Sequence, residues 1–371
     1  MKPIAIRREV EDRRPRLSKD PACPELAGRI LCQDVPGVFR KGHVLRQDDI
    51  PLLMDARWTE IHLLELGPDD IAQREAGLRL AQILSSDGLQ VAPAGHRHVL
   101  KAKHKGLLKI DAAALHRVNS IPGIAVFTLM NDSVVSADQV VAEAQITPLA
   151  IERRAIERAA RQENIVQLRP FVPHDVILFT RDAREVPGLT NKLAWFGCQV
   201  RELLDLAQFG PWAPRVNQAS GLRPRASDPH TRFPSEARGP RPEASNPTLV
   251  LVSGTNALDP LDPAFVALER LGARMQRVGM PVHPGTLLWI ASWNATTIIG
   301  LPSCGLGPQV TGFDLVLPKI LAEGGIRDDD LALLGHGGIL KPVIPSRVDG
   351  EESGPGERTT AQIPRALRGS E

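Results

Sequence analysis

The stretch 248-TLVLVSG-254 decides the fold class, because an apolar run of this length ending in Ser-Gly is typical of a strand buried on both faces of a parallel sheet. The stretch 175-DVILFT-180 has the same character. Segments with helical spacing of apolar residues follow, and we predict helices over 192–207 and 262–275. Alternating strands and helices predict an α/β domain: an open, mostly parallel sheet with helices on both faces, hence three layers.

The same alternation continues toward the C-terminus. We predict strands over 286–292 and 296–301, joined by a turn at Asn294. A helix is expected over 308–325, with apolar residues at helical spacing at Phe313, Val316, Leu317, Ile320 and Leu321. Pro318 lies inside this helix and is expected to kink it, because proline has no N–H to donate.

Upstream of this domain, the pattern mixes helices and strands. Residues 47–56 predict a short helix that Asp48 or Asp49 can cap, and residues 58–66 predict a strand. Asp111 is expected to cap a further helix. The N-terminal part is therefore predicted as a mixed α+β region.

Shifts in composition place the domain boundaries. The mixed α+β region is predicted at 26–151 and the α/β domain at 170–340. The basic stretch 1–25 and the Pro- and Gly-rich stretch 341–371 are predicted to be a disordered arm and tail. Residues 211–247 interrupt the α/β domain with eight Pro and six Arg. Such a segment buries too little apolar surface to offset its ordering entropy.

The overall composition excludes several function classes. The chain has 371 residues and a net charge of +2, so no global field favours nucleic acid or anionic lipid. It contains no Tyr, which excludes a tyrosine nucleophile or general acid. Its cysteines have no paired spacing typical of a zinc finger or a disulfide framework: Cys23, Cys32, Cys198 and Cys304. The N-terminus has no apolar core and no run is long enough to span a bilayer, so a cytoplasmic protein without membrane partners is predicted.

In open α/β sheets, ligands bind outside the carboxyl ends of the strands. The turns to examine are therefore 255-TNALDPLDP-263, 279-GMPVHPGT-286 and 302-PSCGLGPQ-309. The first and third precede helices, whose N-termini offer free N–H groups to an anion. Asp262, followed by a proline, is either a plain helix cap or part of a ligand site with Asp259. Carboxylates there can accept the amino group and ring N–H of a pterin, or hold Mg²⁺ with a phosphate.

Other candidates also have two readings. Cys304 lies near a helix N-terminus, which can lower a thiol pKa, but the favoured reading is a buried or incidental cysteine. His283 either contacts a ligand or is simply solvated. His336 either contacts a ligand or forms a hydrogen bond that fixes its glycine-rich loop. The run 96–109 is a phosphate-attracting rim or a solvated face. No aromatic residues interleave its charges, so nucleic-acid stacking is not predicted.

These turns resemble those of the molybdopterin-binding proteins of molybdenum-cofactor biosynthesis, the molybdopterin molybdenumtransferase family. The stretches that match in order are 251-LVSGTNALDPLD-262, 279-GMPVHPGTLLWIA-291, 297-TIIGLPSCG-305 with 313-FDLVLPKILA-322, and 331-LALLGHGGIL-340. Residues 34–53 and 140–151 also resemble the N-terminal region of a molybdopterin-binding subgroup. The resemblance covers residues 28–208 and 248–340.

The resemblance implies a cytoplasmic protein that binds molybdopterin or its adenylylated form and that, in the transferase members, inserts molybdenum from molybdate with Mg²⁺. It implies catalytic and metal-binding roles for Asp259 and Asp262. The cofactor contacts that it implies are Ser253, Gly254, Thr255, His283, Pro284, Gly285, Pro302, Ser303 and Cys304. A homodimer is compatible with the family.

The chain departs from the family pattern at several of these positions. Thr255 and Ala257 stand where transferases have a second glycine and a serine, and Ser303 stands where glycine is common. A Cβ at 255 hinders close approach of the backbone to a phosphate. Three hypotheses follow: a molybdenum-inserting enzyme, a non-catalytic molybdopterin carrier or sensor, and a degenerate relative in which a frameshift across 211–247 removed part of the sheet.

Overall fold

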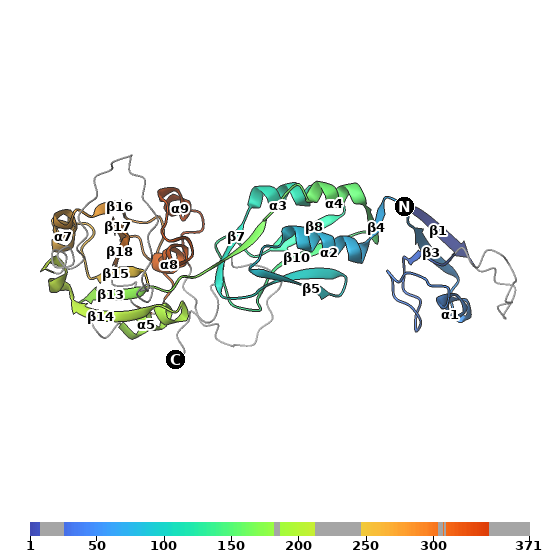
Figure 1. Ribbon diagram of the computed structural model, residues 1–371, viewed down its shortest axis with the longest axis horizontal. Coiled ribbons are helices and arrows are strands. Elements are labelled where there is room, and N and C mark those ends of the chain that lie inside the picture. Colours follow the sequence, from blue (N-terminus) through green and yellow to red (C-terminus); the bar gives the residue numbers. More distant parts are fainter. Residues whose placement is uncertain (8–25, 182–185, 212–245, 303–306, 308, 341–371) are drawn as a thin grey trace, which may run out of the picture. The chain divides into compact units, whose positions relative to one another are not determined.

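The computed structural model describes residues 1–7, 26–181, 186–211, 246–302, 307 and 309–340. The chain divides into two compact units, Met1–Arg169 and Pro170–Glu371 (Figure 1). The predictions of disorder for residues 8–25, 212–245 and 341–371 lie outside the described residues.

The first unit begins with a three-stranded sheet of order β1-β3-β2, made of Lys2–Arg7, Glu60–Glu65 and Ile30–Leu31. β1 corrects the prediction of a disordered arm from the first residue. The sequence KPIAIR alternates, so Ile4 and Ile6 share one face and pack against a buried cluster while the strand pairs antiparallel with β3.

The predicted short helix is confirmed as α1, Asp49–Asp55. Asp48 is its N-cap residue but forms no side-chain cap bond. Asp49 instead accepts a hydrogen bond from the backbone N–H of Arg46 at 2.8 Å, and one from His43 Nε2 at 2.8 Å. These two hydrogen bonds, above all the one from the Arg46 N–H, lower the pKa of the Asp49 carboxyl.

The rest of the first unit is a four-stranded antiparallel sheet with smaller sheets and helices around it. The four strands, in the order β5-β6-β10-β8, are Leu89–Ala94, Arg97–Ala102, Val140–Ile146 and Ile124–Thr128. The smaller strands are β4 (Asp70–Ala72), β7 (Gly106–Ile110), β9 (Val134–Val135), β11 (Ala150–Glu152) and β12 (Val166–Pro170). The helices are α2 (Gln73–Leu84), α3 (Ala112–Asn119) and α4 (Arg153–Ala159).

Capping and edge protection in this unit follow from side chains. Asp111 caps α3 as predicted, accepting the N–H of Ala114 at 2.8 Å. At the sheet edge, Asn119 donates to the carbonyl of Val126 at 3.0 Å and accepts its N–H at 2.8 Å. The amide thus takes the place of a neighbouring strand on β8, which limits pairing with another chain there.

The second unit holds one six-stranded sheet of order β14-β13-β15-β18-β17-β16. Its strands are Gln199–Asp205, Asp175–Thr180, Thr248–Ser253, Thr296–Leu301, Trp289–Trp293 and Arg274–Val278. The first four run parallel, whereas β17 is antiparallel to β18 and β16 to β17. The predicted α/β class with a mostly parallel sheet is therefore confirmed.

The helices with described bounds beside this sheet are α5 (Val186–Trp195), the short 3-10 helix η3 (Leu206–Gln208), α7 (Pro263–Leu271), α8 (Gly312–Glu323) and α9 (Asp328–Leu333). Figure 1 shows α7 on one side of the sheet and α8 on the other. Pro318 lies inside α8, which continues to Glu323. The turn between β17 and β18 is placed as predicted, with Asn294 at a φ of 51°. Within the described residues, no helix combines the length and apolarity needed to cross a bilayer.

Two predicted helices are too long. The helix predicted over 192–207 ends at Trp195, because Gly197 adopts a φ of 81° and the chain then pairs in parallel with β13 as β14. The helix predicted over 262–275 ends at Leu271, because Gly272 forms a left-handed C-cap with a φ of 71° and β16 follows.

Candidate functional site

The strands that the three predicted turns adjoin have their corresponding ends at one edge of the six-stranded sheet. Ser253, at the end of β15, pairs with Leu301 at the end of β18, so the first and third turns leave neighbouring strands side by side. The second turn leads into β17, whose first residue, Trp289, pairs with Gly300 near the end of β18. Motifs that are separate in sequence therefore meet at the carboxyl ends of the parallel strands, where open α/β sheets bind ligands.

The first turn is held by its own side chains. Three acceptors spaced three residues apart each bond a backbone N–H two residues on. Asn256 Oδ1 accepts from Leu258 at 3.2 Å, Asp259 Oδ1 from Leu261 at 2.9 Å, and Asp262 Oδ1 from Ala264 at 2.9 Å. These successive Asx turns give the loop a defined shape without burying it. Leu258 and Leu261 are 76% and 77% exposed.

The two carboxylates of this turn differ in their bonds. Asp262 Oδ2 also accepts the N–H of Asn256 at 2.9 Å, so both oxygens of Asp262 close the loop and cap α7. The helix-cap reading of Asp262 is therefore observed, whereas its role as a metal ligand stays a prediction. Asp259 is exposed, and its hydrogen bond to the turn uses Oδ1. The second oxygen of Asp259 is therefore better placed to meet a ligand than either oxygen of Asp262.

Thr255, which departs from the family pattern, has a structural partner. The fully buried Trp289 donates its indole N–H to Thr255 Oγ1 at 3.0 Å. Phe265 packs edge-on against Trp289, with ring centroids 5.4 Å apart. Gly300 leaves room for the indole, since a Cβ there would lie 1.8 Å from Trp289 Cε2. Because a buried indole N–H needs an acceptor, Trp289 accounts for a hydroxyl at position 255.

The second turn is held by close backbone approach. Gly285 has a φ of 116°, and a Cβ there would lie 2.5 Å from the backbone nitrogen of Gly312 at the start of α8. That same N–H donates to the carbonyl of Pro284 at 2.9 Å. Gly285 is buried, Pro284 is half-buried and His283 is exposed. A glycine is required at 285 because both its conformation and its space exclude a side chain.

The closing segment 335–340 packs onto the second turn from another direction. The N–H of His283 donates to the carbonyl of Gly338 at 2.7 Å, and the N–H of Leu340 donates to the carbonyl of His283 at 2.8 Å. A Cβ at Gly338 would lie 2.2 Å from the carbonyl oxygen of Pro281. His336 is exposed, and its backbone N–H closes the loop onto the carbonyl of Leu333.

A buried ion pair at the start of α8 was missed by sequence reasoning. Lys192 of α5 and Asp314 of α8 have side chains only 5% exposed, with Nζ 2.9 Å from Asp314 Oδ1 and 3.0 Å from Oδ2. Lys192 also donates to the carbonyl of Gln309 at 2.8 Å, and Asp314 Oδ2 accepts the N–H of Thr311 at 2.8 Å. The pair thus fixes the end of the third turn. The signal in the sequence is one charge inside each of the apolar patterns KLAWF and FDLVL.

Of the third turn, Pro302 is described and half-buried, whereas Ser303 and Cys304 lie outside the described residues. Among the described residues, no group of three or more His, Cys, Asp or Glu side chains could hold a metal. Mg²⁺ needs only one or two carboxylates when waters and substrate phosphates complete its shell. Asp259 fits that requirement better than Asp262.

The basic run 96–109 belongs to the first unit, where several of its groups have local partners. His98 is buried, Arg97 pairs with Glu143, and Lys109 Nζ lies 2.6 Å from Asp132. Lys103 Nζ donates to the carbonyl of Asp87 at 2.7 Å. These contacts favour the structural reading of the run over the phosphate rim.

Comparison with known proteins gives little. No family model matches the chain, and no curated protein matches it. Among solved structures, it is similar to the crystal structure of the molybdopterin biosynthesis MoeA protein from Pyrococcus horikosii. The identity is 10%, the TM-score is 0.24, and the match covers 68% of this chain and 80% of that one. This likeness is too distant to indicate function.

Proposed function

We propose that this chain binds molybdopterin, or its adenylylated form, in the biosynthesis of the molybdenum cofactor. The observation that carries the proposal is the convergence of the matched stretches. The turns after β15 and β18 leave adjacent strand ends, and the turn before β17 packs on the start of α8. The closing segment 335–340 is hydrogen-bonded to that turn through the backbone N–H and carbonyl of His283. The placement of α7 and α8 on opposite sides of the sheet supports the three-layer arrangement that the alternation of strands and helices predicts.

The ligand's chemistry fits this edge in two places. Its phosphate needs N–H donors, which turns at the carboxyl ends of parallel strands provide. Its pterin ring carries an amino group beside a ring N–H, which a carboxylate can accept. Asp259, exposed and with an oxygen not used by its turn, is the carboxylate we assign to that contact.

Molybdenum insertion is the finer form of the proposal. Molybdate would be the substrate, and the free oxygen of Asp259 would then hold Mg²⁺ in place of the pterin contact, so that the ion would compensate negative charge on the phosphate and molybdate oxygens. Asp262 would act by holding the loop that carries Asp259, since both its oxygens accept backbone N–H groups.

A non-catalytic carrier or sensor is the second candidate, and Thr255 favours it. The Thr255 hydroxyl is already bonded to Trp289, and its Cβ stands where a transferase would bring bare backbone close to the ligand. Such a turn can still border a bound pterin while hindering the close phosphate contact that chemistry needs.

Anaerobic titration with molybdopterin, followed by quenching of tryptophan emission, tests binding. We expect saturation at one ligand per chain. Adding molybdate and Mg²⁺ and assaying for molybdenum-loaded cofactor then separates the candidates: product identifies the transferase, and binding without product identifies the carrier. Absence of saturable molybdopterin binding would contradict both. A homodimer is a separate prediction, which sedimentation velocity tests directly.

A further inference from the structure

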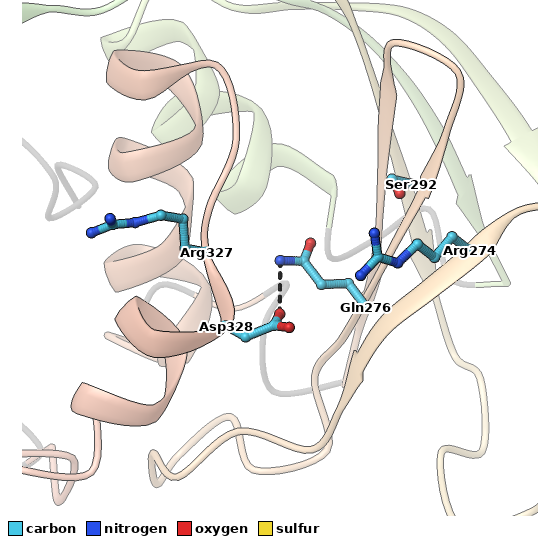
Figure 2. Close-up of a pocket in the computed structure, with 5 residues that line it drawn as sticks. All are labelled: Arg274, Gln276, Ser292, Arg327 and Asp328. Atoms are coloured by element: carbon cyan, nitrogen blue, oxygen red, sulfur yellow. Dashed lines mark hydrogen bonds between the residues drawn. The ribbon is translucent and has the colours of Figure 1, made fainter. Parts of the chain in front are cut away.

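A small polar cavity lies on the second unit, away from the turns described above. Its volume is about 260 Å³, and it is lined by Arg274 and Gln276 of β16, Ser292 of β17, and Arg327 and Asp328 at the start of α9 (Figure 2). Small ligands are held in concave sites with a few well-placed polar groups, and every residue lining this cavity is polar.

The strand register places this cavity toward the opposite edge of the sheet. Arg274 pairs with Ser292, and Ser292 pairs with Thr297 at the start of β18. The proposed molybdopterin crevice lies where Leu301, at the end of β18, pairs with Ser253. The cavity is therefore a separate site, and its function goes beyond the one proposed above.

Part of the lining is already bonded. Gln276 Nε2 donates to the carbonyl of Ile326 at 2.5 Å and to Asp328 Oδ1 at 3.1 Å, so both amide hydrogens are used. Arg327 is bonded to Asp330 at 2.9 and 3.2 Å. Figure 2 shows its side chain extended away from the other four residues.

The lining groups that are not yet bonded divide into hydrogen-bond donors and hydrogen-bond acceptors. Arg274 forms no ion pair within the described part of the chain, and Figure 2 shows the Gln276 side chain between its guanidinium and Asp328. It offers hydrogen-bond donors, as does the Ser292 hydroxyl. Gln276 Oε1 and the second carboxylate oxygen of Asp328 are acceptors. One side of the cavity is thus cationic and the other anionic.

This division selects among small ligands. A simple anion would bond to Arg274 but face the Asp328 carboxylate, and a simple amine would meet the reverse repulsion. A molecule with both groups satisfies both sides, because a guanidinium binds a carboxylate in a forked pair and a carboxylate accepts from an ammonium.

We propose that this cavity binds a small zwitterion carrying a carboxylate and a protonated amine, the chemical class of free amino acids. The carboxylate would contact Arg274 and Ser292, and the amine would contact Asp328 and Gln276 Oε1. Because Arg274 and Asp328 are exposed, salt should screen both contacts and weaken binding.

Calorimetric titration of the full chain at low salt tests this. The probes are glycine, β-alanine and γ-aminobutyrate, which vary the spacing of the two charges, with acetate and methylamine as single-charge controls. We expect at least one zwitterion to saturate at one per chain and to bind at least about tenfold more tightly than either control. Acetate binding as tightly as every zwitterion would overturn the assignment, as would no saturable binding of any zwitterion.

Matched variants locate the site. Asp328→Asn keeps an oxygen that can accept from Gln276 and removes only the charge, and Arg274→Gln changes an exposed side chain. Each should weaken zwitterion binding at least about tenfold. Asp329→Asn, an exposed carboxylate on the same helix, should stay within about twofold. Wild-type affinity in both Arg274→Gln and Asp328→Asn would contradict the proposal while leaving the molybdopterin crevice untouched.

Discussion

The first and second turns meet the same edge of the sheet but are built by different means. The first, from Asn256 to Asp262, is shaped by side-chain oxygens that bond backbone N–H groups, and it is largely exposed. The second is shaped by backbone packing on backbone, which Gly285 and Gly338 permit. A substitution in the first turn removes hydrogen bonds at an exposed loop and leaves the surrounding packing in place. A side chain added at Gly285 or Gly338 in the second arrangement would collide with backbone atoms. We therefore expect the first turn to carry ligand chemistry and the second to carry stability.

Breaking the buried Lys192–Asp314 pair should cause the largest loss of stability. The pair lies at the start of α8, on which the second turn packs. Lys192→Met leaves the Asp314 carboxylate buried without its cation, which costs about 3–5 kcal/mol in comparable cases. Chemical denaturation monitors the loss. A paired Lys192→Met/Asp314→Asn variant, which removes both charges and keeps an oxygen for the Thr311 N–H, should recover much of the stability. Equal destabilisation of the single and double variants would contradict this account of the pair.

Gly338→Ala should come next. Its Cβ would meet the carbonyl oxygen of Pro281 at 2.2 Å and that of Leu334 at 2.7 Å, and neither backbone atom can rotate away. We expect a loss of about 3 kcal/mol in the free energy of unfolding, at the upper end of overpacking effects. Gly337→Ala is a less informative control because of its φ of 83°; Gly325→Ala, where nothing lies within 4 Å, should be close to neutral. Comparable losses in Gly338→Ala and Gly325→Ala would be evidence against close packing.

On the side-chain-built turn, Asp262→Ala should cost less. It removes the cap of α7 and the bond to the Asn256 N–H, both partly exposed, for a loss of about 1–2 kcal/mol. Asp262→Asn keeps an acceptor at the cap and should lie between Ala and wild type. If Asp262→Ala were as damaging as Gly338→Ala, the contrast between the two turns would fail.

The first unit supplies a pH dependence of stability through His98. Burial, with a smaller effect of Arg74, lowers the pKa of His98, whose Nδ1 has no hydrogen-bond partner among the described residues. A histidine kept neutral by folding binds its proton more readily when unfolded. The contribution of neutral His98 to stability is therefore fully present above the unfolded pKa of about 6.5, and it is lost as the pH falls below that value.

Thermal unfolding at pH 7 and pH 5 measures this contribution. His98→Gln should reduce the shift in Tm between the two values. An unchanged shift in His98→Gln would assign the pH dependence to other groups.

The sequence predicts the parts of this fold that local pattern determines. The buried strands, the cap at Asp111, the turn at Asn294 and the first two turns at the sheet edge all follow from local residues. The sequence of β14 favours a helix, because its RELLD segment (201–205) consists mostly of good helix formers, and only its parallel pairing with β13 makes it a strand. Lys192 and Asp314 are far apart in sequence, so their pairing requires the tertiary structure.

Thr255 and Trp289 illustrate the same limit within the site. As a sequence feature, Thr255 is a departure from a glycine-rich turn; in the structure, it is the acceptor for an indole that Gly300 makes room for. The distinction between Asp259 and Asp262 also depends on the structure, because the spacing D-P-L-D does not say which oxygens are already bonded.

Molybdopterin binding by Asp259→Asn, compared with wild type, tests the central claim most directly. The asparagine oxygen can still accept the Leu261 N–H, so the turn and its stability should be unchanged, and only the charge offered to the ligand is lost. We predict saturable binding to wild type and binding at least about tenfold weaker to Asp259→Asn, with equal unfolding midpoints. Equal affinity of the two proteins would contradict the role of Asp259, and no binding to wild type would contradict the function itself.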